Sequence, residues 1–300
     1  MFVSAAIHGD ELNGVEIIRR LIKSSALKRL RGTLIAIPVV NVHGLLNHSR
    51  YLPDRRDLNR SFPGSEKGSL AARVANIFMK EIVKQCTHGI DLHTGAIHRS
   101  NLPQIRANLD DEETARLANA FGVPVLINSI MRDGSLREAS AELGMPFLLY
   151  EAGEALRFDE VSIRAGERGI RNVMRELDML PVKRKPRKQI KPVIARSSNW
   201  VRASISGVFR ATAPLGAHVD KKTVLGIISD PFGEKEWEVH SNVEGIIIGK
   251  NNLPLVNEGE ALFHIARFKG IADVAEKIEE FHDDYQAEFG DNQDVDSPII

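Results

Sequence analysis

A change of pattern near residue 181 divides the sequence into two parts that must fold differently. Residues 1–180 alternate short apolar runs with amphipathic stretches, which is typical of an α/β unit. Residues 193–270 instead contain short apolar runs separated by Gly, Pro, Asn and Asp, which predicts a small all-β unit. The 300-residue chain is long enough to build a core in each part. The sequence therefore predicts two domains.

Two charged segments complete this organisation. Residues 181–192 form a basic stretch, and residues 271–300 form an acidic tail. A basic run can bind nucleic acid, but no aromatic side chains interleave this one, so we interpret it as a solvated linker. The spacing of Val274, Ile278 and Phe281 predicts a helix in the first half of the tail, with these side chains on one stripe. The composition of the last ten residues predicts disorder.

Composition excludes several classes of protein. The 40 basic residues balance 40 acidic ones, so no global field favours nucleic acid or a membrane surface. The single cysteine, Cys86, can form neither an internal disulfide nor a Cys-rich zinc finger. No apolar run approaches the ~20 residues that span a bilayer. We expect a cytoplasmic protein without nucleic-acid or membrane partners, and its state as a monomer or homo-oligomer stays open.

Apolar periodicity predicts the elements of each part. In the first part the expected strands are Phe2–Ile7, Thr33–Val40, Gly89–Leu92, Val123–Asn128 and Pro146–Tyr150. The expected helices are one that begins near Asp10, Leu70–Val83, Asp110–Ala120 and Ser162–Leu177. In the second part the expected strands are Val193–Ala195, Trp200–Ala203, Gly207–Ala211, Thr223–Ile228, Trp237–His240, Gly245–Gly249 and Ala261–Ile265.

A histidine and a glutamate follow the first strand. His8 and Glu11 are three residues apart at the entry to a helix, where an imidazole and a carboxylate can converge on one cation. Two His and one Glu form an established set of catalytic zinc ligands. Taken alone, the pair is also explained by acidic residues that complement the helix dipole.

A third candidate ligand follows a later strand. His93 ends the expected strand from Gly89, and Asp91 shares its strand face, so Asp91 is placed to orient a ligand. The alternative is that His93 merely caps the strand. His98 lies five residues further on, and we interpret it as a polar loop residue.

The segment between these ligands is rich in donors. Arg50 is followed by the run Asp57-Leu58-Asn59-Arg60-Ser61-Phe62-Pro63-Gly64. An arginine fork matches a carboxylate, and an asparagine amide adds a donor beside it. These side chains predict a site for an anionic group, although each of them could also be a solvated surface residue.

Four motifs together carry a family resemblance: HGDELNG, RDLNRSFPG, DLHTG and YEAGE. Over residues 1 to about 180 the chain resembles the succinylglutamate desuccinylase/aspartoacylase family of zinc amidohydrolases. This resemblance implies a zinc-carboxypeptidase-like mixed sheet flanked by helices. The following β unit resembles the barrel-sandwich domain of many relatives, and no lysine in it has the setting for a prosthetic group.

The resemblance also implies roles for particular residues. His8, Glu11 and His93 would bind one Zn²⁺ per chain, and Glu151 would be the general base. Asn59 and Arg60 would hold the substrate carboxylate. Arg50 would polarise the scissile carbonyl, with Arg56 as a rival for that role. Since only seven residues precede His8, whereas relatives usually have more, we expect that the native N-terminus extends upstream.

Three functions remain in competition. The first is a zinc-dependent deacylase that hydrolyses the amide bond of a small anionic N-acyl amino acid. The second is a zinc carboxypeptidase acting on short peptides, because the same clamp would hold a C-terminal carboxylate. The third is a non-catalytic metal-binding interaction module whose basic linker and acidic tail recruit partners. The sequence does not identify the acyl group or the amino acid.

Overall fold

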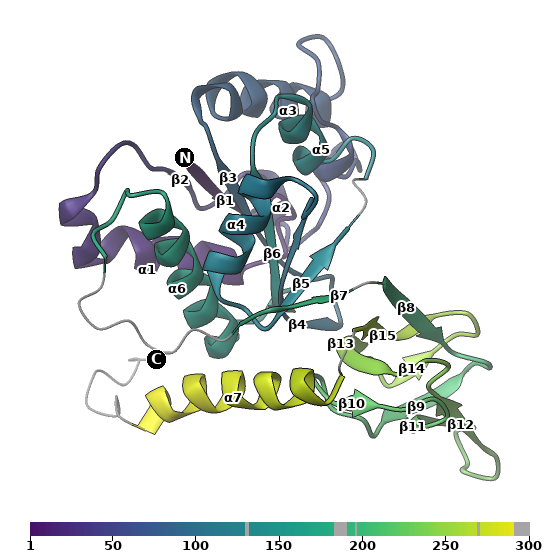
Figure 1. The fold of residues 1–300 in the computed structure, drawn as a ribbon. Helices are drawn as coiled ribbons and strands as arrows, with labels where there is room; N and C mark the ends of the chain where they lie inside the picture. The colour runs from purple at the N-terminus through teal and green to yellow at the C-terminus, as the bar shows by residue number, and fades with distance from the viewer. Residues whose placement is uncertain (130–131, 183–190, 196, 269–270, 291–300) are drawn as a thin grey trace.

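The computed structural model describes residues 1–129, 132–182, 191–195, 197–268 and 271–290. A sheet runs through both parts of the chain, in the order β2-β1-β3-β6-β4-β13-β15-β8 (Figure 1). In the first part its strands are β1 (Phe2–Ala5), β2 (Ile35–Ile37), β3 (Gly89–Gly95), β4 (Arg99–Ala107), β5 (Val125–Asn128) and β6 (Phe147–Glu154). Strands β2, β1, β3 and β6 are parallel, while β4 is antiparallel to β6.

Helices cover this sheet because the strands are apolar on both faces. The helices are α1 (Asn13–Lys23), α2 (Val42–Leu46), α3 (Leu70–Glu81), α4 (Glu112–Phe121), α5 (Leu136–Glu142) and α6 (Glu160–Glu176). Short 3₁₀ turns lie at η1 (Ser25–Arg29), η2 (Leu58–Arg60) and η3 (Val83–Gln85). One core cluster packs α1, α4 and α6 against the sheet, and a second packs α3 and α5 on its opposite side. The first part is therefore a helix–sheet–helix sandwich.

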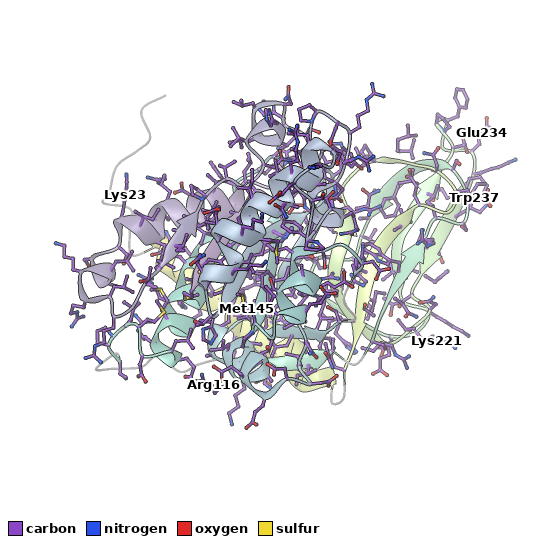
Figure 2. The ribbon with its side chains drawn as sticks, turned by 90° about the horizontal axis from the view of Figure 1, so that it is seen from above. Lys23, Arg116, Met145, Lys221, Glu234 and Trp237 are labelled. Carbon is purple, nitrogen blue, oxygen red and sulfur yellow. The ribbon has the colours of Figure 1, made fainter. Side chains whose placement is uncertain are left out.

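The second part supplies the far end of the sheet and a smaller sheet of its own. Its strands are β7 (Val193–Ala195), β8 (Ser197–Arg202), β9 (Gly207–Ala211), β10 (His218–Val219), β11 (Val224–Ser229), β12 (Glu236–His240), β13 (Gly245–Asn251), β14 (Leu255–Val256) and β15 (Ala261–Arg267). The smaller sheet has the order β12-β11-β9-β14. Figure 2 shows its outer end, marked by Glu234 and Trp237, pointing away from the helical part. The predicted class, a mixed sheet with helices followed by a smaller all-β unit, is confirmed.

The last helix joins the two parts. Helix α7 (Ile271–Gly290) runs from the β unit back beneath α6 (Figure 1). Val274, Ile278 and Phe281 are buried, which confirms the predicted stripe. Val274 and Ile278 pack with β13 and β5 in a junction cluster, while Phe281 reaches the core beside α6. No helix among the described residues is long and apolar enough to cross a membrane.

Several element boundaries differ from the expected ones. Helix α1 begins at Asn13 rather than near Asp10, because residues 8–12 form a turn that buries Glu11. Strand β4 was not predicted, since Pro103 interrupts its pattern; Pro103 lies where the β4–β6 register shifts. Strand β7, expected to open the β unit, pairs with β5. Residues 183–190 of the predicted linker (181–192) and the final ten residues lie outside the described residues.

Candidate active site

Two histidines and a glutamate converge where β1 and β3 end. His8 follows β1 and His93 is in β3, the strand next to β1, so both side chains reach the same edge of the sheet. Glu11 comes from the turn before α1, and all three residues are at most 5% exposed. Their potential ligand atoms lie within 4.8 Å of one another. Among the described residues, these three form the buried group that could hold a metal ion.

The orientation of each imidazole is set by a carboxylate behind it. Nε2 of His93 lies 2.7 Å from Asp91, and Nε2 of His8 lies 3.2 Å from Asp57. The Nδ1 atoms lie 2.7 Å and 2.8 Å from the two oxygens of Glu11. A carboxylate that accepts the Nε2 proton leaves Nδ1 with a free lone pair, which is how metal-binding histidines are commonly fixed. The donor set fits a divalent metal, and Asp91 lies on the same strand face as His93 and contacts it, as strand parity predicted.

The charges of this cluster perturb one another. Burial alone would raise the pKa of Glu11, but His8 and His93 outweigh it and hold that pKa well below its usual range. Burial lowers the pKa of His93, but Asp91 and Glu11 raise it well above its ordinary value. Without a metal, the Nδ1 atom of each histidine therefore holds a proton against Glu11, and a divalent cation bound there would displace that proton.

The three metal-site residues line a cavity of about 420 Å³. The cavity is also lined by Arg50, Asn59, Arg60 and Glu151, so the structure brings all seven predicted site residues together. Six arginines and two glutamates, Glu11 and Glu151, lie among the described lining residues. The excess of cations favours an anionic ligand.

Arg50 lies directly beside the metal-site cluster. Its Nη2 atom donates to Asp57 at 3.0 Å and its Nη1 atom to Glu11 at 3.3 Å. Burial lowers the pKa of Arg50, but Glu11 and Asp57 together raise it by more than burial lowers it. The guanidinium therefore stays charged. Arg56 is exposed and is not among the lining residues, and neither is His98.

Asn59 and Arg60 form η2 on the cavity wall. Asp57 caps this turn by accepting from the backbone of Asn59, and Asn59 Oδ1 accepts from the backbone of Leu136 at 2.9 Å. Asn59 is therefore fixed with its amide nitrogen available. Burial lowers the pKa of Arg60 and Asp57 raises it, but with Arg132 and Arg50 nearby the net shift is downward. An anion placed between these cations would relieve their repulsion.

Glu151 lies in β6 beside His93 of β3. It was expected at the end of its strand, but β6 continues to Glu154 because β3 and β4 flank it there. Asn101 donates Nδ2 to Oε2 of Glu151 at 2.5 Å, and Arg106 Nε lies 3.3 Å from Oε1. Asn101 is thus a hydrogen-bond donor to this carboxylate, while Arg106 is an ion-pair partner whose Nε makes no hydrogen bond among the described residues.

The far wall of the cavity comes from the β unit. Trp200 of β8 and His264 of β15 are cross-strand partners, and their rings stack 4.4 Å apart at an interplanar angle of 6°. Arg99 lies over the Trp200 ring at 5.3 Å. Burial lowers the pKa of His264 to about 3, with help from Arg106 and Arg132, so its imidazole is neutral. No motif marks these residues, because their proximity depends on how β13 joins β4.

Comparisons with known proteins agree with this geometry. The family model for the succinylglutamate desuccinylase/aspartoacylase catalytic domain matches residues 1–177. An N-alpha-acetyl-L-2,4-diaminobutyric acid deacetylase of Halomonas elongata is 28% identical over 273 residues, which cover 86% of this chain and 79% of that protein.

Solved structures share the fold. The product-bound ectoine utilization protein EutE of Ruegeria pomeroyi has a TM-score of 0.79 at 24% identity, covering 88% of this chain and 84% of that one. A succinylglutamate desuccinylase/aspartoacylase from Rhodobacter sphaeroides has a TM-score of 0.80 at 23% identity, covering 89% and 85%. In both cases the similarity extends beyond the first part of the chain into the β unit.

Proposed function

The chain belongs to the succinylglutamate desuccinylase/aspartoacylase family, and on this basis we propose that it is a zinc-dependent deacylase of N-acyl amino acids. The observation that carries the proposal is the convergence of His8, Glu11 and His93 beside Glu151 in one arginine-rich cavity. Two His and one Glu are a ligand set of catalytic zinc. The Halomonas relative, whose name describes removal of an acetyl group from an amino acid derivative, supports the same reaction class.

In this proposal the chain's own residues bind and orient the substrate. Asn59 and Arg60 hold its carboxylate through an amide donor and a guanidinium fork. Arg50, 3.3 Å from Glu11, faces the scissile carbonyl and stabilises the negative charge that develops on its oxygen. Asp57 keeps Arg50 in place through Nε and Nη2.

Glu151 moves the proton. When bound, zinc supplies Lewis acidity that lowers the pKa of water toward neutrality. Glu151 accepts a proton from the attacking water and then donates it to the leaving amine nitrogen as the amide C–N bond breaks. The products are a carboxylate and a free amine. Because each proton taken up by Glu151 is returned, the residue ends the cycle as it began.

The test is a Glu151→Gln variant assayed with a panel of N-acyl amino acids that includes N-acetyl-diaminobutyrate. We expect kcat to fall by about 10²- to 10⁴-fold, because a general base is lost. One zinc per chain should remain bound, since Glu151 is not among the proposed ligands. Glu142→Gln, on the exposed surface of α5, is the matched control and should keep full activity. Full activity in Glu151→Gln would refute its role as the base.

The substrate panel also separates the competing functions. A carboxypeptidase would hydrolyse short peptides faster than N-acyl amino acids, because the clamp would then hold a C-terminal carboxylate. A non-catalytic metal-binding module would retain zinc and hydrolyse no amide in the panel. Either outcome would replace the deacylase proposal.

A further inference from the structure

The β unit contacts the catalytic part along a short ladder at one end of β4. Strand β13 pairs Gly249 with Asn101, Lys250 with Ser100 and Asn251 with Arg99. Beyond this ladder Asn252 donates Nδ2 to Ser100 Oγ at 2.6 Å. The segment of β4 that β13 fixes is therefore the one that carries Asn101.

Asn101 is the direct neighbour of the proposed base. Its Nδ2 atom donates to Glu151 Oε2 at 2.5 Å, and its side chain is 92% buried within the cavity wall. Hydrogen bonds to a charged partner are among the stronger ones in proteins. Arg106 Nε lies 3.3 Å from Oε1 but makes no hydrogen bond among the described residues, so Asn101 is the hydrogen-bond donor that orients this carboxylate.

Because Gly249 has no side chain, the amide of Asn101 can lie directly beside it. A Cβ at position 249 would lie 2.9 Å from Asn101 Oδ1 and 3.3 Å from Cβ of His264. Contacts below 3.0 Å are essentially never seen for real Cβ atoms. A side chain at position 249 therefore requires a small shift, which the Asn101 amide, as the end of a side chain, makes more easily than the backbone does, and that amide is the donor to Glu151.

We propose that the β unit positions the general base: Gly249 of β13 seats Asn101, and Asn101 orients Glu151 for proton transfer. This inference rests on the proposed function of Glu151. Neither Gly249 nor Asn101 takes part in a covalent step, so both are positioning residues. The β unit then contributes to the rate of hydrolysis, as well as to the wall of the cavity.

A double-mutant cycle tests this chain of contacts. Asn101→Ala should lower kcat by about 10- to 100-fold, as expected for loss of a hydrogen bond to a charged group. Its KM should stay within about twofold, and its zinc content should stay unchanged. Gly249→Ala should lower kcat in the same way. The double variant should be no slower than Asn101→Ala alone, because the alanine at 101 removes the atom that Cβ of residue 249 would strike.

Two further variants keep the test decisive. Asn101→Asp has nearly the same shape but no donor, so it should be at least as slow as Asn101→Ala, whereas a residue that only filled space would tolerate it. Lys250→Ala, the neighbour on β13, should keep the wild-type kcat. If Gly249→Ala does not fold, the Asn101 variants decide the proposal.

The outcomes separate this inference from the proposed function. Full activity in Glu151→Gln would refute the proposed function itself. An inactive Glu151→Gln together with wild-type kcat in Asn101→Ala and Asn101→Asp would refute only the positioning role. Multiplicative effects of the Gly249 and Asn101 substitutions would show that Gly249 does not act through Asn101.

Discussion

The two histidines of the candidate metal site turn the same ring nitrogen, Nδ1, toward Glu11. In both, Nδ1 faces Glu11 and Nε2 faces a further carboxylate, Asp57 for His8 and Asp91 for His93. The motif HGDE and the strand-end DLHTG were enough to predict that His8, Glu11 and His93 come together with Asp91 behind His93. The role of Asp57 behind His8 was not predicted, because 49 residues separate the two and no local spacing joins them.

His264 shows the limit of motif reasoning for single residues. Nothing adjacent in the sequence distinguishes it from the other histidines, yet it lines the cavity at 5% exposure. Its Nδ1 atom is buried without a hydrogen-bond partner in the part of the chain that the structure describes. Its environment arises from strands β8, β13 and β15 and from arginines of the catalytic part.

This buried imidazole should make the protein sensitive to acid. In the unfolded chain it binds a proton as the pH falls through about 6.5, whereas burial, Arg106 and Arg132 hold its folded pKa at about 3. Its contribution to stability is therefore complete above pH 6.5 and is lost progressively between pH 6.5 and pH 3. At pH 5 the loss is about 2 kcal/mol.

The measurement is urea unfolding of wild type and His264→Gln at pH 7.5 and pH 5. The variant should lose about 2 kcal/mol less than wild type between the two pH values. His43→Gln, on the exposed surface of α2, should keep the wild-type difference. Equal losses in wild type and His264→Gln would show that this imidazole is not what confers the acid sensitivity.

Helices and strands with a regular apolar pattern were predicted correctly, whereas those with an irregular pattern were not. Helix α3 begins at Leu70 as predicted, and Ser69 caps it by accepting from the backbone of Ala72. Strand β2 is shorter than expected because β1 pairs with only three of its residues. Strand β4 was missed because its polar start and internal proline hide a strand whose pairing partners, β6, β5 and β13, are distant in sequence.

The packing of α6 on α4 depends on a glycine. A Cβ at Gly169 would lie 2.1 Å from the ring of Phe121, which is 1% exposed in the core. Gly169→Ala should therefore lower the free energy of unfolding by about 1–3 kcal/mol through overpacking. Urea denaturation would measure this change.

A second substitution checks the cause. Phe121→Leu removes ring atoms from the contact, so Gly169→Ala should cost less in a Phe121→Leu background than in wild type. The same cost in both backgrounds would show that the Phe121 ring is not the source of the destabilisation. The helix backbone cannot explain such a cost, because alanine is a better helix former than glycine.

The molecule as a whole is built around a sheet that both parts share. A junction cluster joins Leu102 and Val125 of the catalytic part to Ile246 and Ile248 of β13 and to Ile278 of α7. The change of composition near residue 181 predicted the fold class correctly, with a mixed sheet and helices first and a smaller sheet of short strands after. The shared sheet could not be predicted, because strand order across the units depends on pairings between distant segments.

This junction predicts that the two parts unfold together. Ile248→Ala, at a fully buried site, should cost about 2–5 kcal/mol and lower the midpoint of a single calorimetric transition. Phe232→Ala, where the phenyl ring is 89% exposed in the β unit, should leave the midpoint unchanged. Two resolved transitions, of which Ile248→Ala moves only one, would show that the parts are thermodynamically independent.

The wall formed by Ser198, Trp200 and His264 has a consequence for recombination among relatives. A chimera that takes its β unit from another family member would exchange one side of the cavity while His8, Glu11 and His93 stayed in place. Substrate range could then diversify by exchange of a whole segment, without stepwise change beside the metal. Such grafts would succeed most readily between parents that share a glycine at the position of Gly249 and an asparagine at that of Asn101.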